Sequence, residues 1–461
     1  MREYPLKNVE EPCLMEDVFP HTIPPRIVFD GKIVEYIDGK RIEFDPQEAL
    51  RRDLCVTDTT FRDGQQARPP YSVSQQVRLY EMLAQLNGSS NVIRQTEFFL
   101  YTKNDRAALD ACRSLGYAFP EVTGWIRANK GDFRLVKEAG LKETGVLTSS
   151  SDYHIFQKQR QTRQEAFDQY IEVVEAALEA GVRVRCHLED VTRADVFGFV
   201  FPFVQKVMRL AEQVPDDLKP KIRLCDTLGF GVTYPGAALP RSVPKLVWYM
   251  NHECGVPPER LEWHGHNDFH KVLINAATAW LYGCNAANCT LFGYGERTGN
   301  PPLEGAIIEL CSHRGSTMGM NLPLITEIAD YMRSIHFPIP DNYPLVGRDA
   351  FTTKAGIHAD GLRRGDRIYN IFDTEKLLGR APRVSITDKT GVDGIVVWVN
   401  DFLALKGTQD AVGKLDVFKI QKWVMEQYND HGRLTAISEE ELEEQTRLHL
   451  PDLYAKYKDP R

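Results

Sequence analysis

The stretch Glu262-Trp263-His264-Gly265-His266-Asn267-Asp268 has the pattern of a β-strand that ends in two histidines. Side chains two residues apart on a strand point to the same face, so His264 and His266 can reach one point together. Two imidazoles that converge on one point suit a metal ion. A pair of this kind standing alone is more often two ordinary core histidines, so the neighbouring motifs decide the interpretation.

Two further motifs supply oxygen ligands for such an ion. A glycine-rich loop over residues 293–302 contains Asn300, and the segment 58–66 far upstream contains Asp63. Together with the two histidines they form a nitrogen and oxygen ligand set of the kind that binds divalent cations. We therefore expect the chain to bring these distant segments to one place.

The bulk composition is that of an ordinary soluble protein. The chain has 461 residues, 43% hydrophobic and 26% charged, which indicates one large domain with additions. Its net charge of −8, without a long basic run, argues against a nucleic-acid partner. Residues 1–20 lack the apolar core of a signal peptide, and no apolar run reaches the length of a membrane span. Nine cysteines without a CxxC pair indicate reduced thiols, so we expect a cytoplasmic protein.

From Leu54 onward, short apolar strands alternate with amphipathic segments of helical length. Helices are expected over 74–86, 106–115 and 164–180. Eight such strands over about 260 residues predict a (β/α)8 TIM barrel, with a doubly wound sheet as the alternative. The barrel is favoured because polar residues follow many different strands, as they do at a barrel's active site. The strands are expected near residues 54–60, 92–98, 121–126, 143–149, 182–189, 221–227, 260–266 and 286–293.

The remaining chain divides around this barrel. We predict an N-terminal arm over 1–50, with a hairpin that has Asp-Gly turns at 30–31 and 38–39. The catalytic barrel is expected over 51–315. A linker or lid subdomain, carrying His358, is expected over 316–370, and a helical C-terminal region over 371–461.

Polar side chains at the first two strand ends suggest chemistry. Arg62, beside Asp63, could hold a substrate oxygen that gains charge during a reaction. Glu97 ends the second strand, and a buried glutamate opposite Arg62 would fix the guanidinium in one plane. The alternative for Arg62 and Asp63 is a surface ion pair.

On the fifth strand, Arg185, His187 and Glu189 share one face by the same alternation. If that face is inward, its cationic groups must meet an anion, because an unpaired buried charge is costly. The alternative is that these residues face the helices. Thr227, after the sixth strand, could hold a carboxylate, whereas His358 in its Gly/Ala-flanked loop could be merely exposed.

Taken together, the motifs at 57–66, 264–268, 293–300 and 356–358 resemble the isopropylmalate synthase and homocitrate synthase family of metal-dependent (DRE-TIM) barrels. The resemblance covers about residues 50 to 370. It implies a Claisen condensation of acetyl-CoA with a 2-oxo acid, followed by thioester hydrolysis. It also implies a divalent metal, Mn²⁺ or Co²⁺ first and Mg²⁺ or Zn²⁺ next, and a homodimer in which the partner subunit supplies the His358 loop.

The resemblance also assigns roles to particular residues. By position, the implied metal site consists of Asp63, His264, His266 and Asn300. The implied catalytic residues are Arg62, Glu97, Glu189, His358 and Tyr369, and the choice of base between Glu189 and His358 stays open. The implied substrate-binding residues are Arg62, Gln66, His154, Arg185, His187 and Thr227.

The chain departs from the usual family pattern in two respects. Gln65-Gln66 stands where the family has Glu-Gln, and the absence of a long regulatory domain puts feedback by leucine in doubt.

The whole pattern most resembles the Re-type citrate synthase branch, whose acceptor is oxaloacetate. Arg185, His187 and Arg127 also favour a dicarboxylate, and the bulk of His187 favours a four-carbon one. The alternatives are 2-oxoglutarate or 2-oxoisovalerate as acceptor, a lyase of the same barrel family, and a non-catalytic binding protein.

Overall fold

The computed structural model describes residues 1–458, which form two compact units. One unit is Ile27–Leu324. The other combines Met1–Arg26 with the chain from Ile325 onward. Within residues 1–458, no helix is both long and apolar enough to span a membrane.

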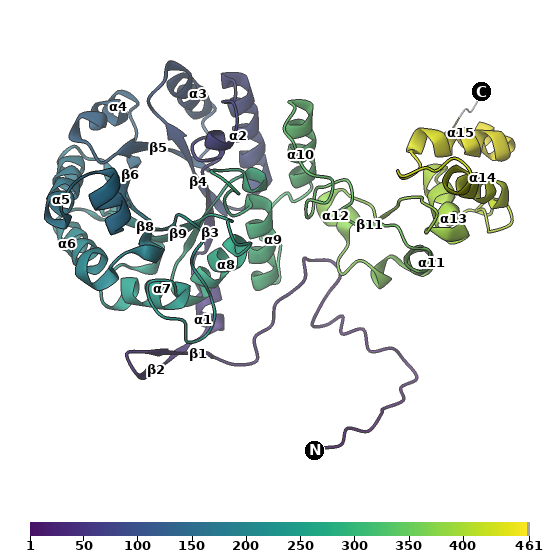
Figure 1. The fold of residues 1–461 in the computed structure, drawn as a ribbon, viewed down its shortest axis with the longest axis horizontal. Helices are drawn as coiled ribbons and strands as arrows, with labels where there is room; N and C mark the ends of the chain where they lie inside the picture. The colour runs from purple at the N-terminus through teal and green to yellow at the C-terminus, as the bar shows by residue number, and fades with distance from the viewer. Residues whose placement is uncertain (459–461) are drawn as a thin grey trace. The chain divides into compact units, whose positions relative to one another are not determined.

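The larger unit is a closed barrel of eight parallel strands (Figure 1). Each strand pairs with its neighbours in chain order, and the last strand pairs with the first, which confirms the predicted TIM barrel and excludes the doubly wound sheet. The eight strands are β3 (Cys55–Asp58), β4 (Ile93–Phe99), β5 (Glu121–Arg127), β6 (Glu143–Ser149), β7 (Arg183–Glu189), β8 (Lys221–Asp226), β9 (Leu261–Gly265) and β10 (Ala286–Cys289).

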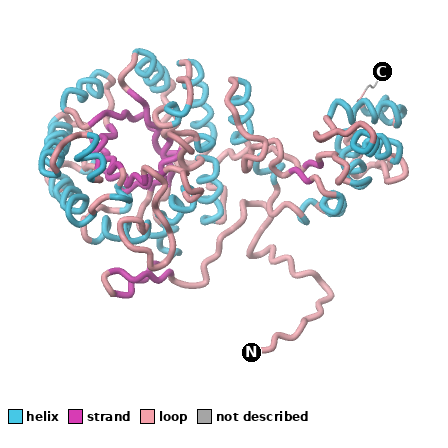
Figure 2. Tube along the Cα trace, in the orientation of Figure 1, coloured by secondary structure: helices cyan, strands magenta, loops and turns pink. Residues whose placement is uncertain are grey.

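Helices surround the strands on the outside (Figure 2). Capping boxes define several helix starts, for example Ser72 with Gln75 and Thr162 with Glu165. Apolar side chains such as Leu79 and Val174 are fully buried, so the main core lies between the strands and these helices. The helices are α2 (Val73–Asn87), α3 (Lys103–Ser114), α4 (Phe133–Glu138), α5 (Arg163–Glu179), α6 (Phe201–Ala211), α7 (Val243–His252), α8 (Val272–Tyr282) and α9 (Leu303–Arg314).

An antiparallel hairpin precedes the barrel. It consists of β1 (Ile33–Ile37) and β2 (Lys40–Phe44), and α1 (Pro46–Arg51) follows. The turn lies at Asp38-Gly39, where both residues have positive φ as a tight hairpin turn requires. The other predicted turn, at 30–31, is a bend outside the strands. The hairpin belongs to the barrel unit and residues 1–26 to the other unit, so the predicted 1–50 arm is divided between the two.

The second unit is mainly helical, as the sequence predicted for the C-terminal region. Its core includes Ile395, Val399, Ile420, Val424 and Leu442, contributed by three helices. The elements are α10 (Leu324–Ser334), β11 (Thr352–Thr353), α11 (Gly356–Arg364), α12 (Thr374–Leu378), β12 (Arg383–Val384), α13 (Gly391–Phe402), α14 (Phe418–Asn429), α15 (Glu439–His449) and α16 (Pro451–Tyr457).

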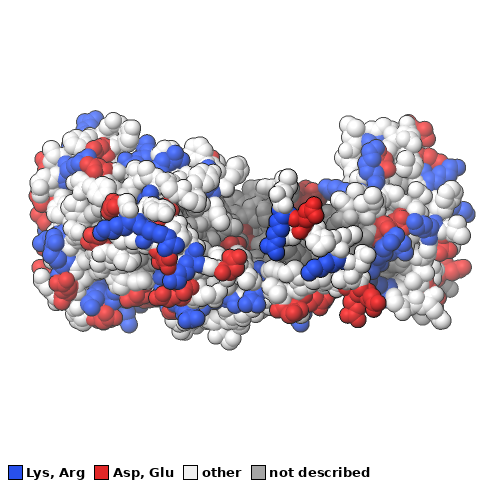
Figure 3. All heavy atoms as spheres, turned by 90° about the horizontal axis from the view of Figure 1, so that it is seen from below, with Lys and Arg blue, Asp and Glu red and all other residues white. Residues whose placement is uncertain are grey.

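The N-terminal segment is attached to this second unit by hydrogen bonds. The His21 ring bonds the backbone carbonyl of Asn370 at 3.2 Å, and the Asp373 N–H donates to the His21 carbonyl at 2.9 Å. Glu16 also pairs with Arg367. On the face drawn in Figure 3, acidic and basic side chains are interspersed.

Candidate active site and metal centre

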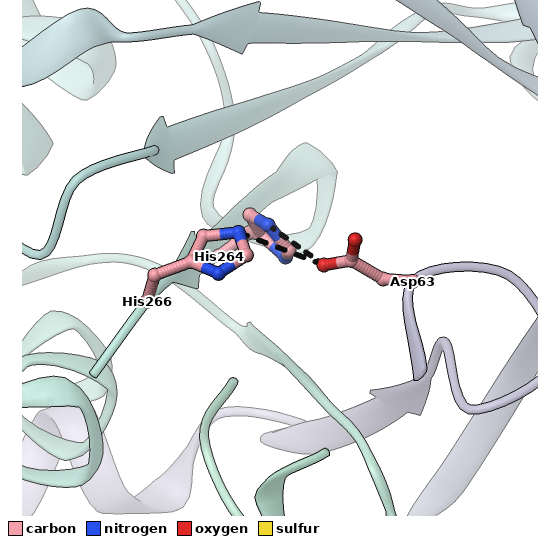
Figure 4. A group of neighbouring side chains, drawn as sticks. All are labelled: Asp63, His264 and His266. Atoms are coloured by element: carbon pink, nitrogen blue, oxygen red, sulfur yellow. Dashed lines mark ion pairs between the residues drawn. The ribbon is translucent and has the colours of Figure 1, made fainter. Parts of the chain in front are cut away.

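Asp63, His264 and His266 converge at the carboxyl ends of the barrel strands (Figure 4). The Nε2 atom of each histidine lies 3.6 Å from Asp63 Oδ2, and one ligand atom from each residue lies within 4.8 Å of the others. All three side chains are buried. Asp63 follows β3, His264 lies near the end of β9 and His266 comes directly after it, so the closure of the barrel brings the two distant motifs together.

Asn300 completes this group. Its Nδ2 donates to Asp63 Oδ2 at 2.8 Å, and its Oδ1 is buried without a hydrogen-bond partner. A Cβ at Gly295 would lie only 1.7 Å from that oxygen, so the glycine-rich loop leaves room for the amide. Two imidazoles, a carboxylate and a spare amide oxygen fit a divalent cation.

The protonation of these groups also suits a cation. Burial raises the pKa of Asp63, but the charges of Arg62, His266 and His264 outweigh this effect and hold the pKa well below its usual range. Burial lowers the pKa of His264 to about 3, although Asp63 opposes the shift. An ionised carboxylate and a neutral imidazole are the forms that bind metals.

A chain of hydrogen bonds orients His264 from behind. Its Nδ1 lies 2.8 Å from Asn288 Oδ1, and Asn288 Nδ2 donates to Thr57 Oγ1 at 2.8 Å. The Thr57 hydroxyl donates to Glu262, which also accepts from Arg223 Nε at 2.5 Å. Partners of this kind fix the tautomer and the ring orientation of a metal-binding histidine.

Arg62 and Glu97 form the pair that the sequence suggested. Arg62 Nε donates to Glu97 Oε1 at 2.8 Å, and Arg62 Nη1 lies 3.4 Å from Asp63 Oδ1. The guanidinium carbon lies 5.6 Å from the centre of the Trp125 ring. With 9% and 1% of their side chains exposed, Arg62 and Glu97 are not a surface ion pair. The guanidinium is therefore fixed beside the candidate metal ligands.

Arg185 faces the barrel interior, which is one of the two alternatives that the alternation on β7 left open. Carboxylates of the protein already pair with its guanidinium. Its Nη2 donates to Glu97 Oε2 at 2.5 Å, its Nη1 to Glu143 Oε1 at 2.8 Å, and its Nε lies 3.4 Å from Glu262 Oε2. This geometry does not support the expectation that Arg185 anchors a substrate carboxylate, because carboxylates of the protein already neutralise its charge. Arg185 belongs to a structural network inside the barrel.

His187 lies in the same network. Its Nε2 is 3.3 Å from Arg185 Nε and 3.5 Å from Glu97 Oε2. Burial and the charge of Arg223 hold its pKa well below the usual range, so the ring is neutral. A Cβ at Gly145 would lie 2.5 Å from His187 Nε2, so only a glycine leaves room for this ring.

Glu189 stands apart from that network, in a second polar group. His154, from the π-helix η3 (Tyr153–Lys158), places its Nδ1 3.0 Å from Glu189 Oε2, and Lys158 Nζ lies 3.0 Å from Oε1. Burial raises the pKa of Glu189, but His154 and Lys158 outweigh it and lower the pKa to about 2. Glu189 is therefore ionised at neutral pH and can accept a proton.

Two other predicted residues, Thr227 and Gln66, lie as follows. Thr227, just after β8, accepts the Asp190 N–H at its hydroxyl oxygen at 2.8 Å. Gln66 is exposed, whereas the buried Gln65 ties the loop together through the Phe61 carbonyl and the Tyr71 N–H.

Arg127 does not contribute a free charge to the site. It is 63% exposed and pairs through two nitrogens with Asp132, at 2.9 and 3.2 Å. The structure therefore gives no support to the expectation that Arg127 helps to bind a dicarboxylate.

His358 and Tyr369 lie together in the second unit. His358 is in the first turn of α11, and Tyr369 follows the short helix η9 (Asp366–Ile368). The two ring centroids are 4.5 Å apart, and both side chains are exposed at the edge of a pocket of about 550 Å³. The tyrosine and the histidine therefore lie side by side, and the histidine stands on a helix, not in a loop.

Sequence reasoning missed several residues that shape the site, among them Asn288, Glu262, Arg223 and Trp125. The alternation used on β7 would have found Arg223 on β8, and it would have found Glu262 two residues before His264. Asn288 carried no such signal, because its partner Thr57 lies 231 residues away.

The fold and this site define a metal-dependent enzyme of the TIM-barrel type. Residues 53–332 match the HMGL-like family, and the chain belongs to that family. The membership predicted from the motifs is thus confirmed.

Three curated relatives match over nearly the whole chain. A citrate (Re)-synthase of Syntrophus aciditrophicus is 52% identical over 98% of this chain and 70% of its own length. A citrate (Re)-synthase of Clostridium kluyveri is 47% identical over 98% of this chain and 97% of its own length. A 2-phosphinomethylmalate synthase of Streptomyces hygroscopicus is 38% identical over 95% of this chain and 96% of its own length.

Proposed function

We propose that this protein is an acyltransferase that condenses acetyl-CoA with oxaloacetate and hydrolyses the thioester, so that citrate and CoA are released. The observation that carries the proposal is the 52% and 47% identity to two citrate (Re)-synthases across 98% of the chain. The relative named for a different product is less similar, at 38%. The free thiol state of all nine cysteines supports a cytoplasmic location.

Asp63, His264 and His266 would hold a divalent cation, with Asn300 as a further ligand or close neighbour. Mn²⁺ or Co²⁺ are the first candidates, and Mg²⁺ or Zn²⁺ the next. When bound, such an ion acts as a Lewis acid on the ketone and carboxylate oxygens of a 2-oxo acid.

Arg62 would stabilise the oxygen that gains charge during the condensation. Glu97 holds its guanidinium in position before the substrate arrives, and a donor fixed in advance needs no reorganisation during the reaction. The Thr227 hydroxyl, at the end of β8, is our candidate for the carboxylate of the acceptor.

Proton removal from the acetyl methyl group requires a base. Glu189 is ionised at neutral pH, and His154 and Lys158 hold it in place. His358, supported by Tyr369, is the second candidate, and we propose that it acts across the interface of a homodimer.

The test is a thiol-release assay with acetyl-CoA and four acceptors: oxaloacetate, 2-oxoglutarate, pyruvate and 2-oxoisovalerate. We expect kcat/KM to be highest for oxaloacetate, with citrate as the product. A preference for 2-oxoglutarate or 2-oxoisovalerate would instead indicate a homocitrate or isopropylmalate synthase. A lyase or a non-catalytic protein would release no CoA with any acceptor.

A further inference from the structure

The second unit contains a pocket of about 500 Å³ that the proposed chemistry does not use. We propose that this arginine pocket binds a phosphate group of a nucleotide. Its wall is built by α10, α13, α15 and the segments 348–352 and 379–386. Four arginines line it, Arg333, Arg348, Arg380 and Arg383, together with three acidic residues, Asp330, Asp349 and Glu439.

Arg380 is the central observation. Its Nη2 and Nη1 donate to the backbone carbonyls of Gly347 and Val346 at 2.7 and 3.3 Å. Its Nε is buried and has no hydrogen-bond partner, and Arg380 forms no ion pair with any residue in 1–458. A half-buried guanidinium without a carboxylate is incompletely neutralised, so an anion would stabilise it.

The charged groups around Arg380 also favour the binding of an added anion. Burial lowers the pKa of Arg380, and the charges of Arg383 and Arg333 lower it further, while the charge of Asp330 opposes the shift. Asp349 is paired with Lys354 at 2.9 Å, and Glu439 lies 3.7 Å from Arg383 with both side chains mostly exposed. Exposed pairs of this kind are weak, so the arginines can turn toward a stronger anion.

The class of ligand follows from two kinds of lining residue, the arginines and the apolar residues. Guanidinium groups bind phosphate oxygens through two parallel hydrogen bonds. The lining also includes apolar residues, among them Trp398, Ile386 and Leu442. An indole ring is a surface on which a nucleobase can stack. A molecule with both a phosphate and a base matches this wall better than a simple anion.

Two sources could supply such a phosphate: the nucleotide end of CoA, or a free nucleotide that regulates the enzyme. Thr352 lines both the arginine pocket and the neighbouring pocket that contains His358 and Tyr369. CoA is therefore the first source to test, and only this choice of source rests on the proposed function.

The binding test uses isothermal titration calorimetry on the full chain, with inorganic phosphate, ADP, CoA and dephospho-CoA as probes. The variants are Arg380→Met and Arg383→Glu, with Arg447→Met, an exposed arginine of α15 outside the pocket, as the matched control. We expect both pocket variants to weaken ADP or CoA binding at least about tenfold, as the loss of one charge-assisted hydrogen bond predicts. The control should bind as the parent does.

Arg383→Glu keeps the test decisive if Arg380→Met fails to fold, because Arg383 is an exposed side chain. If no probe binds, or if Arg383→Glu binds as tightly as the parent, the proposal is overturned. An inactive preparation that still binds ADP would count against the proposed function and not against the pocket.

Kinetics then separate the two sources. If the pocket takes CoA, Arg383→Glu should raise the KM for acetyl-CoA at least about fivefold with little change in kcat, since a charge-assisted contact is lost. If ADP binds but the KM for acetyl-CoA is unchanged, the ligand is a free nucleotide. Either result supports the phosphate site, because ADP binding and its loss in the variants are required in both.

Discussion

The Nδ1 atom of His264 donates to Asn288 Oδ1 across 2.8 Å, and this bond turns Nε2 of the same ring toward Asp63. The direction follows from the next contact, because Asn288 uses its own N–H to reach Thr57 Oγ1. The acceptor side of the amide therefore faces the imidazole. A neutral ring with its proton on Nδ1 has its lone pair on Nε2, where a metal would be.

Replacement of Asn288 should therefore weaken metal binding without removing a ligand. We expect Asn288→Leu to lower metal affinity by roughly 10- to 100-fold, the usual effect of losing such a supporting partner. Titration of the metal-free protein with Mn²⁺ measures this directly. Asn285→Leu is the control, because Asn285 is also buried and immediately precedes β10. Equal affinity in the two variants would mean that the bond does not orient His264.

Removal of the metal should abolish turnover. A chelator would take away the cation that we propose Asp63, His264 and His266 hold, and added Mn²⁺ or Co²⁺ should restore thiol release. The metal content before and after dialysis, together with the assay, checks this. Full activity in verified metal-free protein would contradict a metal-dependent reaction.

Arg62→Lys should keep the fold and lose most of the activity. An ammonium cannot replace a planar guanidinium that is fixed by Glu97 and lies against Trp125. We expect kcat to fall by about 100- to 1,000-fold, as when one oxyanion donor is removed. Arg127→Lys is the matched control, because Arg127 is bound to Asp132 at the surface. A loss below about fivefold would show that Arg62 is structural.

Glu189 should contribute to stability in a pH-dependent way. Its pKa falls from about 4.5 to about 2 in the folded chain, so the unfolded chain binds the extra proton between these values. The stabilisation, up to about 3 kcal/mol, is therefore complete above about pH 5 and is lost as the pH falls toward 2. Glu189→Gln should be less stable than the parent at pH 7, and the difference should shrink at pH 4 and below. Urea unfolding at several pH values measures it, and a difference independent of pH would contradict the assignment.

His358 should work on the active site of a partner subunit. Chains with His358→Ala and chains with Asp63→Ala are each expected to be inactive. After exchange, a mixed dimer has one barrel with intact Asp63 that receives an intact His358. Roughly a quarter of the parent activity should return, since half of the dimers are mixed and each has one complete site. Mixtures shown to exchange but without activity would place His358 within its own subunit, or outside the reaction.

The sequence alone determined the barrel and the candidate metal-binding group. Alternation of strand and helix is a local property, and each of the eight strands could be placed from residues next to it in the chain. His264 and His266 needed only the two-residue repeat of a strand to share a face. Once the strands form a closed parallel barrel, their carboxyl ends lie at one rim, and Asp63 and Asn300 meet the histidines there.

Only the tertiary structure decided which charges satisfy one another inside that barrel. Arg185 pairs with Glu97 and Glu143, which lie 88 and 42 residues earlier in the chain. Strand alternation put Arg185 on one face with His187 and Glu189, but it did not show how many carboxylates the other strands direct to the same level of the barrel. Whether an inward cation binds a substrate or a neighbouring strand depends on the register of the closed sheet, and a single sequence does not contain that register.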